Sequence, residues 1–206
     1  MRLIDAEQKI LHLKQPVIQT RDAAACLNIP IAHANQILAG LAKAGRFVRL
    51  MRGRWATTTQ IDPLILPEYL TLPFPSYVSL QTALFFHGMI SQIPHIIYAA
   101  SLARTKQYTT PFATISIHHI QADFFFGFEM TGQIKMATPE KALVDTFYLS
   151  AARSRLFKKL PEIELPKTFD FKKAAAIIKK IKSSRTRTLV ETRLDELKEV
   201  KSQQLT

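Results

Sequence analysis

The side chains best suited by type to do chemistry in this sequence are polar and basic residues that can recognise nucleic acid. Glutamine and asparagine amides hydrogen-bond base edges, whereas lysine and arginine contact phosphates. Residues 1–58 carry nine basic and three acidic side chains, a net charge of +6. We expect His33, Asn35 and Gln36 near base edges, and we expect backbone contacts from Thr20, Arg21, Lys43, Arg49, Arg52 and Arg54.

The elements that must position these residues are three helices and a hairpin. Helices are predicted over Asp5–His12, over Arg21–Leu27 with Thr20 as its N-cap, and over Ile31–Ala44. Glycine suits a tight hairpin turn. The hairpin is therefore predicted from strands at Arg46–Met51 and Trp55–Thr59 around the tip Arg52-Gly53-Arg54.

The third predicted helix separates into an apolar and a polar face. Gln36 and Lys43 lie opposite the apolar stripe, beside small residues that would let the backbone approach a groove. Two helices joined by a short turn and followed by a hairpin resemble the winged helix-turn-helix motif, which implies DNA binding. The alternative is that the polar face and the arginines are only solvated. The predicted buried stripe is Ala34, Ile37, Leu38 and Leu41, and the small residues are Ala32, Ala39 and Gly40.

Histidines and acids further along the chain raise the question of metal chemistry. His118 and His119 are adjacent, and neighbours in a strand point to opposite faces, so the two imidazoles are not expected to share an ion. Asp123 followed by Lys135 is loosely similar to metal-dependent nucleases. Two-metal hydrolysis needs several converging carboxylates, and few lie near these positions. A nuclease is kept as the enzymatic alternative.

No other pattern predicts catalysis or a cofactor. The six glycines are scattered and form no phosphate-binding loop, and no serine sits in a nucleophile-elbow pattern. Cys26 is the single cysteine, which excludes an intrachain disulfide and a cysteine-based zinc site. We therefore expect no enzymatic activity, no metal and no cofactor.

Prolines and hydrophobic patterning predict an α+β fold in several parts. A proline-rich linker at 63–76 is expected between a winged helix-turn-helix domain at 1–62 and a central α+β domain at 77–150. Basic helices at 151–206 are expected to pack with the central domain. In the central domain we predict helices at Leu80–Phe86 and Glu140–Ser150, and strands at His95–Ser101, Ala113–Ile120, Phe124–Met130 and Gln133–Ala137.

Several short segments resemble the AbiEi family of antitoxins and transcriptional regulators. Arg104 also falls where that family often has a basic residue, and the resemblance covers roughly residues 5–150. The segments that carry it are Tyr77-Val78-Ser79-Leu80, Ala83-Leu84, His87-Gly88-Met89-Ile90 and Ala137-Thr138-Pro139-Glu140-Lys141-Ala142-Leu143-Val144-Asp145.

The resemblance implies a sequence-specific DNA-binding protein that represses its own operon. Many members of the family are the antitoxin of a type IV toxin–antitoxin pair, in which the toxin is a nucleotidyltransferase. The antitoxic activity is ascribed to the part beyond the winged helix. The expected partners are double-stranded DNA of the protein's own promoter and such a toxin from the same operon. A stand-alone regulator without a toxin would have the same sequence features.

The last part of the chain is strongly basic. Residues 151–206 carry fifteen basic and seven acidic side chains, and helices are predicted at Phe171–Lys182 and from about Thr186 to Val200. Apolar residues form an arc along one side of the first of these helices. The lysines on the opposite side form a solvated surface, a phosphate-contacting surface or a site for an acidic partner. The arc lacks the interfacial tryptophan typical of membrane-binding helices. These lysines are Lys172, Lys173, Lys179 and Lys180.

Composition limits the remaining classes of protein. The 206 residues carry a net charge of +12, which favours a polyanionic partner. No apolar run reaches the roughly 18–20 residues that a membrane span needs. Charges at Arg2 and Asp5 come too early for a signal peptide. We expect a cytoplasmic protein that does not bind membranes.

Overall fold

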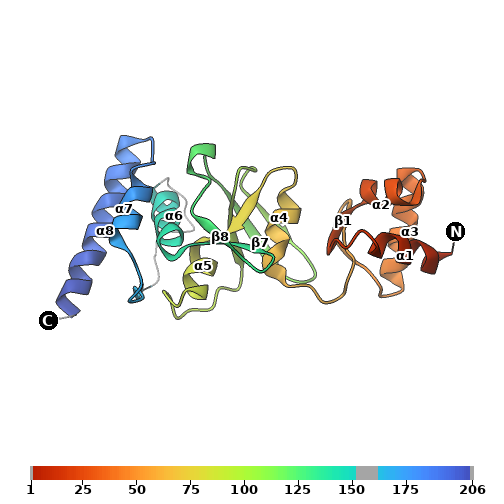
Figure 1. Ribbon diagram of the computed structural model, residues 1–206, viewed down its shortest axis with the longest axis horizontal. Coiled ribbons are helices and arrows are strands. Elements are labelled where there is room, and N and C mark those ends of the chain that lie inside the picture. Colours follow the sequence, from red (N-terminus) through yellow and green to blue (C-terminus); the bar gives the residue numbers. More distant parts are fainter. Residues whose placement is uncertain (1, 152–161, 205–206) are drawn as a thin grey trace. The chain divides into compact units, whose positions relative to one another are not determined.

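The computed structural model describes residues 2–151 and 162–204, and it confirms the α+β class. The rest of the predicted C-terminal region, residues 152–161 and 205–206, lies outside the described residues. The described chain holds eight α-helices and two sheets (Figure 1). It divides into two compact units: the first runs to Pro63 and includes Thr109–Ala113, and the second takes up the chain from Leu64.

The first unit packs three helices on a small antiparallel sheet of order β1-β3-β2. Its core joins Ala6 and Ile10 of the first helix to Leu38 and Leu41 of the third and to Trp55 of the sheet. The elements are α1 (Leu3–Leu11), β1 (Val17–Gln19), α2 (Thr20–Leu27), α3 (Ile31–Lys43), β2 (Val48–Met51) and β3 (Arg54–Ala56).

Three details of this unit differ from the sequence prediction. Helix α1 begins at Leu3 with Arg2 as its N-cap, two residues before the predicted start at Asp5. Helix α2 begins at Thr20 itself, so Gln19 rather than Thr20 is the N-cap. The Asp22 carboxylate accepts a hydrogen bond from the Gln19 backbone N–H at 2.9 Å, which satisfies a donor at the helix start. Strand β1 was not predicted, because three residues are too few to show an alternating pattern.

The second unit is built around a six-stranded mixed sheet of order β6-β7-β5-β4-β9-β8. Strand β4 is parallel to β9, and β5 is parallel to β7, whereas β4–β5 and β8–β9 are antiparallel. Helix α6 contacts α5, α7 and α8, and Figure 1 shows α6, α7 and α8 together in cyan and blue. The elements are η1 (Pro63–Ile65), α4 (Leu66–Thr71), β4 (Ser76–Val78), α5 (Leu80–Phe86), β5 (Ile97–Ser101), β6 (Lys106–Thr109), β7 (Thr114–His119), η2 (Ala122–Phe124), β8 (Phe128–Thr131), β9 (Ile134–Ala137), α6 (Pro139–Ala151), α7 (Phe171–Ile178) and α8 (Ser184–Gln204).

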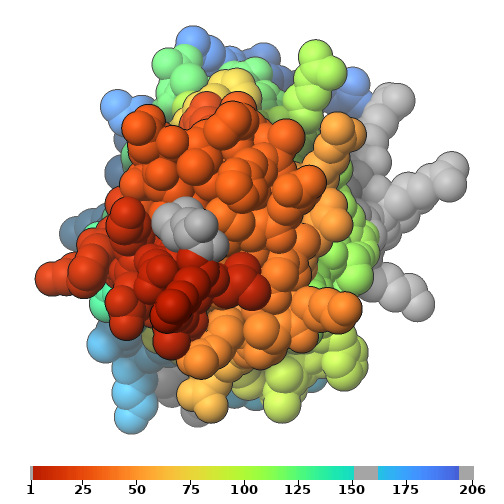
Figure 2. Space-filling view, turned by 90° about the vertical axis from the view of Figure 1, so that its right-hand side faces the viewer, coloured from red at the N-terminus to blue at the C-terminus, as the bar shows by residue number. Residues whose placement is uncertain are grey.

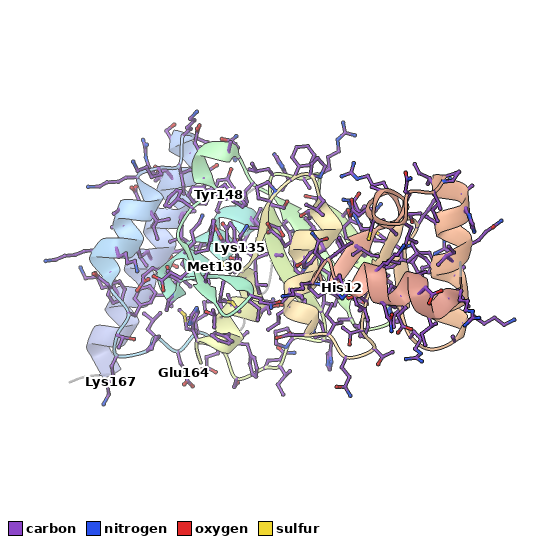
Figure 3. All side chains as sticks on the ribbon, turned by 45° about the vertical axis from the view of Figure 1, so that its right-hand side comes forward. His12, Met130, Lys135, Tyr148, Glu164 and Lys167 are labelled. Carbon is purple, nitrogen blue, oxygen red and sulfur yellow. The ribbon has the colours of Figure 1, made fainter. Side chains whose placement is uncertain are left out.

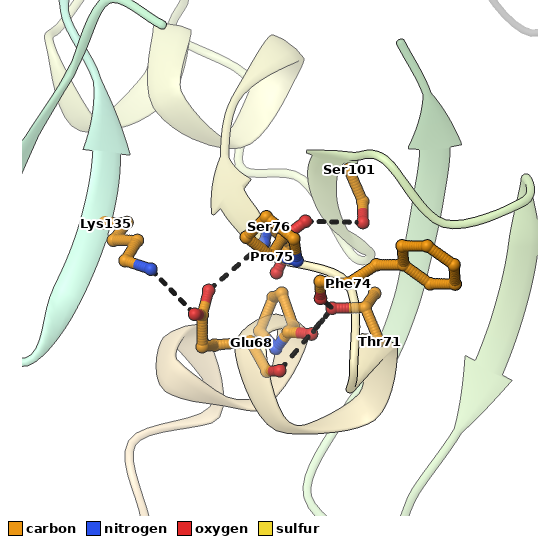
Figure 4. A network of polar contacts seen from close by, with 8 residues as sticks. Glu68, Thr71, Phe74, Pro75, Ser76, Ser101 and Lys135 are labelled. Atoms are coloured by element: carbon orange, nitrogen blue, oxygen red, sulfur yellow. Dashed lines mark hydrogen bonds and ion pairs between the residues drawn. The ribbon is translucent and has the colours of Figure 1, made fainter. Parts of the chain in front are cut away.

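The stretch predicted as a linker, 63–76, instead forms η1, α4 and the first residue of β4. Pro67 lies in the first turn of α4, where a missing backbone N–H costs nothing. Glu68 fastens this helix to the sheet, as Figure 4 shows. Its carboxylate lies 2.7 Å from Lys135 Nζ on β9 and accepts the Ser76 backbone N–H on β4 at 3.1 Å. Proline content alone therefore misidentified an ordered segment as a connector.

A buried polar network lies between the sheet and α6. Lys141 Nζ is 2.6 Å from Asp145 Oδ1 and donates to the Phe124 carbonyl at 2.9 Å, and both side chains of this ion pair are fully buried. Tyr77 and Ser79 donate their hydroxyls to Asp145 Oδ2 at 2.9 and 2.7 Å. Every charged atom in the network therefore has a partner, which is the condition for tolerating charges in a core.

Aromatic rings complete the surroundings of the buried ammonium. Lys141 Nζ lies 3.4 Å from the ring centroid of Phe124 and 5.0 Å from that of Phe126. Burial lowers the pKa of Lys141, although the Asp145 carboxylate opposes that shift. Burial, helped by Asp145, also raises the pKa of Tyr77 well above its ordinary value. Gly127 has a positive φ of +78°, and a Cβ there would lie 3.0 Å from Lys141 Cγ.

We expect Lys141→Met to lower the free energy of unfolding of the second unit by about 3–5 kcal/mol, because it leaves the Asp145 charge buried without its cation. Lys135→Met is the matched control, since it breaks a half-exposed pair with Glu68 and should cost less than about 1 kcal/mol. Urea unfolding followed by circular dichroism measures both. Equal losses in the two variants would contradict the account of the network.

Candidate nucleic-acid interface

A three-residue turn joins α2 to α3 in the first unit. Asn28 ends α2 in the left-handed conformation, with φ of +51°, which asparagine tolerates better than most residues. The Ile29 backbone N–H donates to the Ala24 carbonyl at 3.0 Å, and Pro30 then caps α3. The turn is therefore specified by its own residues.

Helix α3 presents its predicted polar residues to solvent. Ala34, Ile37, Leu38 and Leu41 are buried against α1, α2 and the sheet. In the described chain no hydrogen bond or ion pair engages the side chains on the other side of the helix. Figure 2 looks onto the red and orange surface of this unit. The exposed polar side chains on α3 are those of His33, Asn35, Gln36 and Lys43.

One small residue on α3 has a different role from the expected one. A Cβ added to Gly40 would lie 3.2 Å from Leu3 Cδ2, so this glycine provides space for α1. Ala32 and Ala39 are exposed. The prediction that all three small residues open the helix toward a groove is therefore wrong for Gly40.

The hairpin of β2 and β3 carries the three predicted arginines in different states. Gly53 makes the turn with φ of +76°, a conformation that glycine adopts without strain. Arg52 is exposed at the tip. Arg49 is exposed and its guanidinium carbon lies 5.5 Å from the Trp55 ring centroid. Arg54 is half-buried and donates to Met51 Sδ at 3.7 Å, so it is less available than the other two.

Two neighbouring residues at the start of α2, both predicted to contact phosphates, differ in exposure. Arg21 is exposed, with Nε 3.8 Å from Asp22 Oδ1. Thr20 is buried, and its hydroxyl oxygen accepts a hydrogen bond from Trp55 Nε1 at 3.0 Å. Its backbone N–H donates to the Gly53 carbonyl. Thr20 therefore positions α2 against the hairpin, and its hydroxyl is engaged by Trp55 rather than presented to a phosphate.

The C-terminal lysines belong to the second unit, and one of them is structural. Lys173 Nζ lies 3.4 Å from Glu140 Oε2, a buried carboxylate on α6, while Glu140 Oε1 accepts the Asp170 backbone N–H. The pair therefore holds the start of α7 on α6. Lys172, Lys179 and Lys180 are exposed.

The residues considered for metal chemistry do not converge. His118 is buried, 3.0 Å from Ser116 Oγ, whereas His119 is exposed, as the alternation of a strand predicts. Asp123 pairs with Lys182, and Lys135 pairs with Glu68. Among residues 2–151 and 162–204, no three histidine, cysteine, aspartate or glutamate side chains gather closely enough to hold a metal ion.

Comparison with known proteins adds no family assignment. No protein-family model matches the chain, and no curated protein matches it. No helix in the described ranges is long and apolar enough to cross a membrane.

We expect His118 to make the second unit less stable in mild acid. Burial lowers the pKa of His118 from 6.5 to about 4. As the pH falls between these values, the unfolded chain binds a proton that the folded chain does not, so stability decreases, by about 3 kcal/mol in total.

The measurement is the free energy of unfolding across this pH range for His118→Gln, with His119→Gln as the exposed control. The fall between the two pH values should shrink in the first variant and persist in the second. An undiminished fall in His118→Gln would refute the assignment.

Proposed function

We propose that the first unit is a winged helix-turn-helix module that binds double-stranded DNA in a sequence-specific manner. The order α1-β1-α2-α3-β2-β3 supports this proposal, since α3 follows α2 across a short turn and the β2–β3 hairpin follows α3. In this interpretation α3 is the recognition helix and the hairpin is the wing. The chain then acts as a transcriptional repressor of its own operon.

The observation that carries the proposal is the free polar face of α3. His33, Asn35 and Gln36 are exposed on a helix whose other face is fixed in the core, so their positions are set by rigid structure. An amide such as that of Gln36 can make two hydrogen bonds to adenine in the major groove, and a bidentate contact is worth about 1–3 kcal/mol of discrimination. Lys43, at the end of the same helix, would contact a phosphate.

The exposed arginines supply the sequence-independent part of the affinity. One of these arginines, Arg21, lies on α2 and precedes α3 in the chain. The other two, Arg49 and Arg52, lie on the hairpin that follows α3. The Trp55 ring under Arg49 restricts that guanidinium, which lowers the entropy lost on binding a phosphate. The net charge of +6 on residues 1–58 favours encounter with DNA.

An antitoxin role in a type IV toxin–antitoxin system follows from the resemblance to the AbiEi family. We propose that the second unit carries this role without enzymatic chemistry and that the protein works in the cytoplasm. Co-expression with a nucleotidyltransferase encoded beside the gene tests the role, and growth rescued by the full chain is the expected result. If rescue fails while operator binding holds, the stand-alone regulator is the better account.

A metal-dependent nuclease is the remaining alternative. It would require Asp123 and Lys135 to act together, but each pairs with a different residue, Lys182 and Glu68 respectively. Metal-dependent cleavage of DNA that is lost in Asp123→Asn would favour it.

We expect Gln36→Ala to change sequence preference and leave binding to unrelated DNA unchanged. At one base pair of the operator, discrimination between bases should fall by about 5- to 150-fold, the equivalent of one bidentate contact of about 1–3 kcal/mol. Binding to a panel of singly substituted operators measures the effect, with Gln8→Ala on the exposed side of α1 as the control. A uniform loss across the panel would remove Gln36 from base recognition.

We expect Arg52→Ala to weaken binding to all DNA sequences alike. Losing one phosphate contact should reduce the slope of log affinity against log salt by about 0.9. Lys9→Ala on α1 removes the same charge away from the hairpin and serves as the control. An unchanged slope in Arg52→Ala would show that the hairpin tip does not contact the backbone.

A further inference from the structure

We propose that Ile31, the first residue of α3, recognises a thymine of the operator by packing against its methyl group. Such a contact adds an apolar group to a recognition helix whose other expected contacts are polar or basic. It would fix one A·T base pair of the operator, so it deepens the proposed DNA-binding function and rests on it.

The side chain of Ile31 is exposed and has no part in the core. It is 60% exposed, more than any other large apolar side chain in residues 2–63. Single exposed apolar residues are ordinary on protein surfaces, so what distinguishes Ile31 is its position. The core of the first unit takes four other residues from the apolar stripe of α3, namely Ala34, Ile37, Leu38 and Leu41.

Ile31 lies at the N-terminus of the proposed recognition helix. Pro30 is the N-cap of α3, and Ile31 follows it as the first helical residue. In helix-turn-helix proteins the N-terminal residues of the recognition helix contact base edges. Ile31 also precedes Asn35 by four residues, a spacing that makes two side chains neighbours on a helix surface. An exposed apolar side chain therefore adjoins an exposed amide at the end of α3 that would meet the bases.

The rest of α3 favours a close approach to DNA. The helix contains no acidic residue that would repel phosphates, and Lys43 in its last turn is basic. Ala32, beside Ile31, is exposed and small, so it would not hold the helix away from a groove. A van der Waals contact between Ile31 and a base is therefore compatible with the surface around it.

The chemistry of base edges selects thymine as the contact. In the major groove the base pairs present hydrogen-bond donors and acceptors, and thymine adds an apolar group, its C5 methyl. A polar edge placed against Ile31 would lose hydrogen bonds to water without replacement, whereas a methyl group gains by leaving water. Ile31 should therefore favour thymine at the base that it meets.

Helix geometry places this thymine near the base that Asn35 contacts. An asparagine amide suits adenine, to which it can make two hydrogen bonds. Four residues rise about 6 Å along a helix and neighbouring bases are about 3.4 Å apart, so we expect the thymine within about two base pairs of that adenine. Binding of Asn35→Ala to singly substituted operators locates the adenine.

Replacing single thymines by uracil in the DNA upstream of the gene tests the contact, because uracil lacks only the methyl group. The unmodified full chain should lose about fourfold in affinity at one thymine, the effect of one buried methyl group. In Ile31→Ala the same replacement should have no effect. Ile4→Ala should keep the fourfold loss and is the matched control, since Ile4 is a 53% exposed isoleucine on α1, the helix that ends beside His12 in Figure 3.

The possible outcomes separate this contact from DNA recognition as a whole. Circular dichroism confirms that both variants fold. If the unmodified chain prefers the upstream DNA but tolerates every uracil replacement, or if Ile31→Ala shows the same losses as the unmodified chain, the Ile31 contact is overturned and the proposed function stands. If the unmodified chain does not prefer the upstream DNA to scrambled DNA, the proposed function fails and the Ile31 contact fails with it.

Discussion

The buried indole of Trp55 is the constraint on which the first unit depends. It lies on the central strand of the sheet, opposite Ile18 of β1 and Arg49 of β2. A buried indole N–H without an acceptor would cost about 1–3 kcal/mol, and Thr20 at the start of α2 supplies that acceptor. One side chain therefore fixes the helix start, the three strands and the base of the hairpin together. This packing around Trp55 holds the exposed face of α3 and the arginines in place.

The second unit depends on a different buried interaction, the Lys141–Asp145 pair. Its partners Tyr77 and Ser79 come from the first segment that resembles the AbiEi family, and the pair itself comes from the last. Segments far apart in the sequence thus meet in one hydrogen-bonded core. These segments therefore supply residues that specify the fold of the second unit.

The sequence predicted the regular parts of the fold well, for identifiable physical reasons. Helix α3 ends within one residue of its predicted end because Ala44-Gly45 stops an apolar periodicity that Pro30 had started. The exposed polar residues of α3 followed from that periodicity. Strands β1, β4 and β6 are too short to predict, because three or four residues carry no clear period, and prolines, which usually break helices, conceal α4.

Tertiary contacts decided what local patterns could not. Thr20 has a side chain typical of an N-cap, but its hydroxyl lies in the core, where it accepts the hydrogen bond of the Trp55 indole. The Asp22 carboxylate instead accepts the backbone N–H of Gln19 at the helix start. Lys173 is exposed like its lysine neighbours, yet its ammonium group pairs with the buried Glu140 carboxylate. The one available signal for the core pair was a lysine and an aspartate four residues apart within an otherwise apolar helix. Spacing alone does not say whether such a pair is buried.

The central claim is that this protein recognises a particular DNA sequence through the first unit. The most direct test is a salt series of binding to the DNA immediately upstream of its own gene, compared with scrambled DNA of the same composition. Specific recognition predicts a preference of about a thousandfold or more that persists as salt rises. Equal affinity for both DNAs, falling steeply with salt, would contradict the account and leave only the attraction of a basic protein for a polyanion.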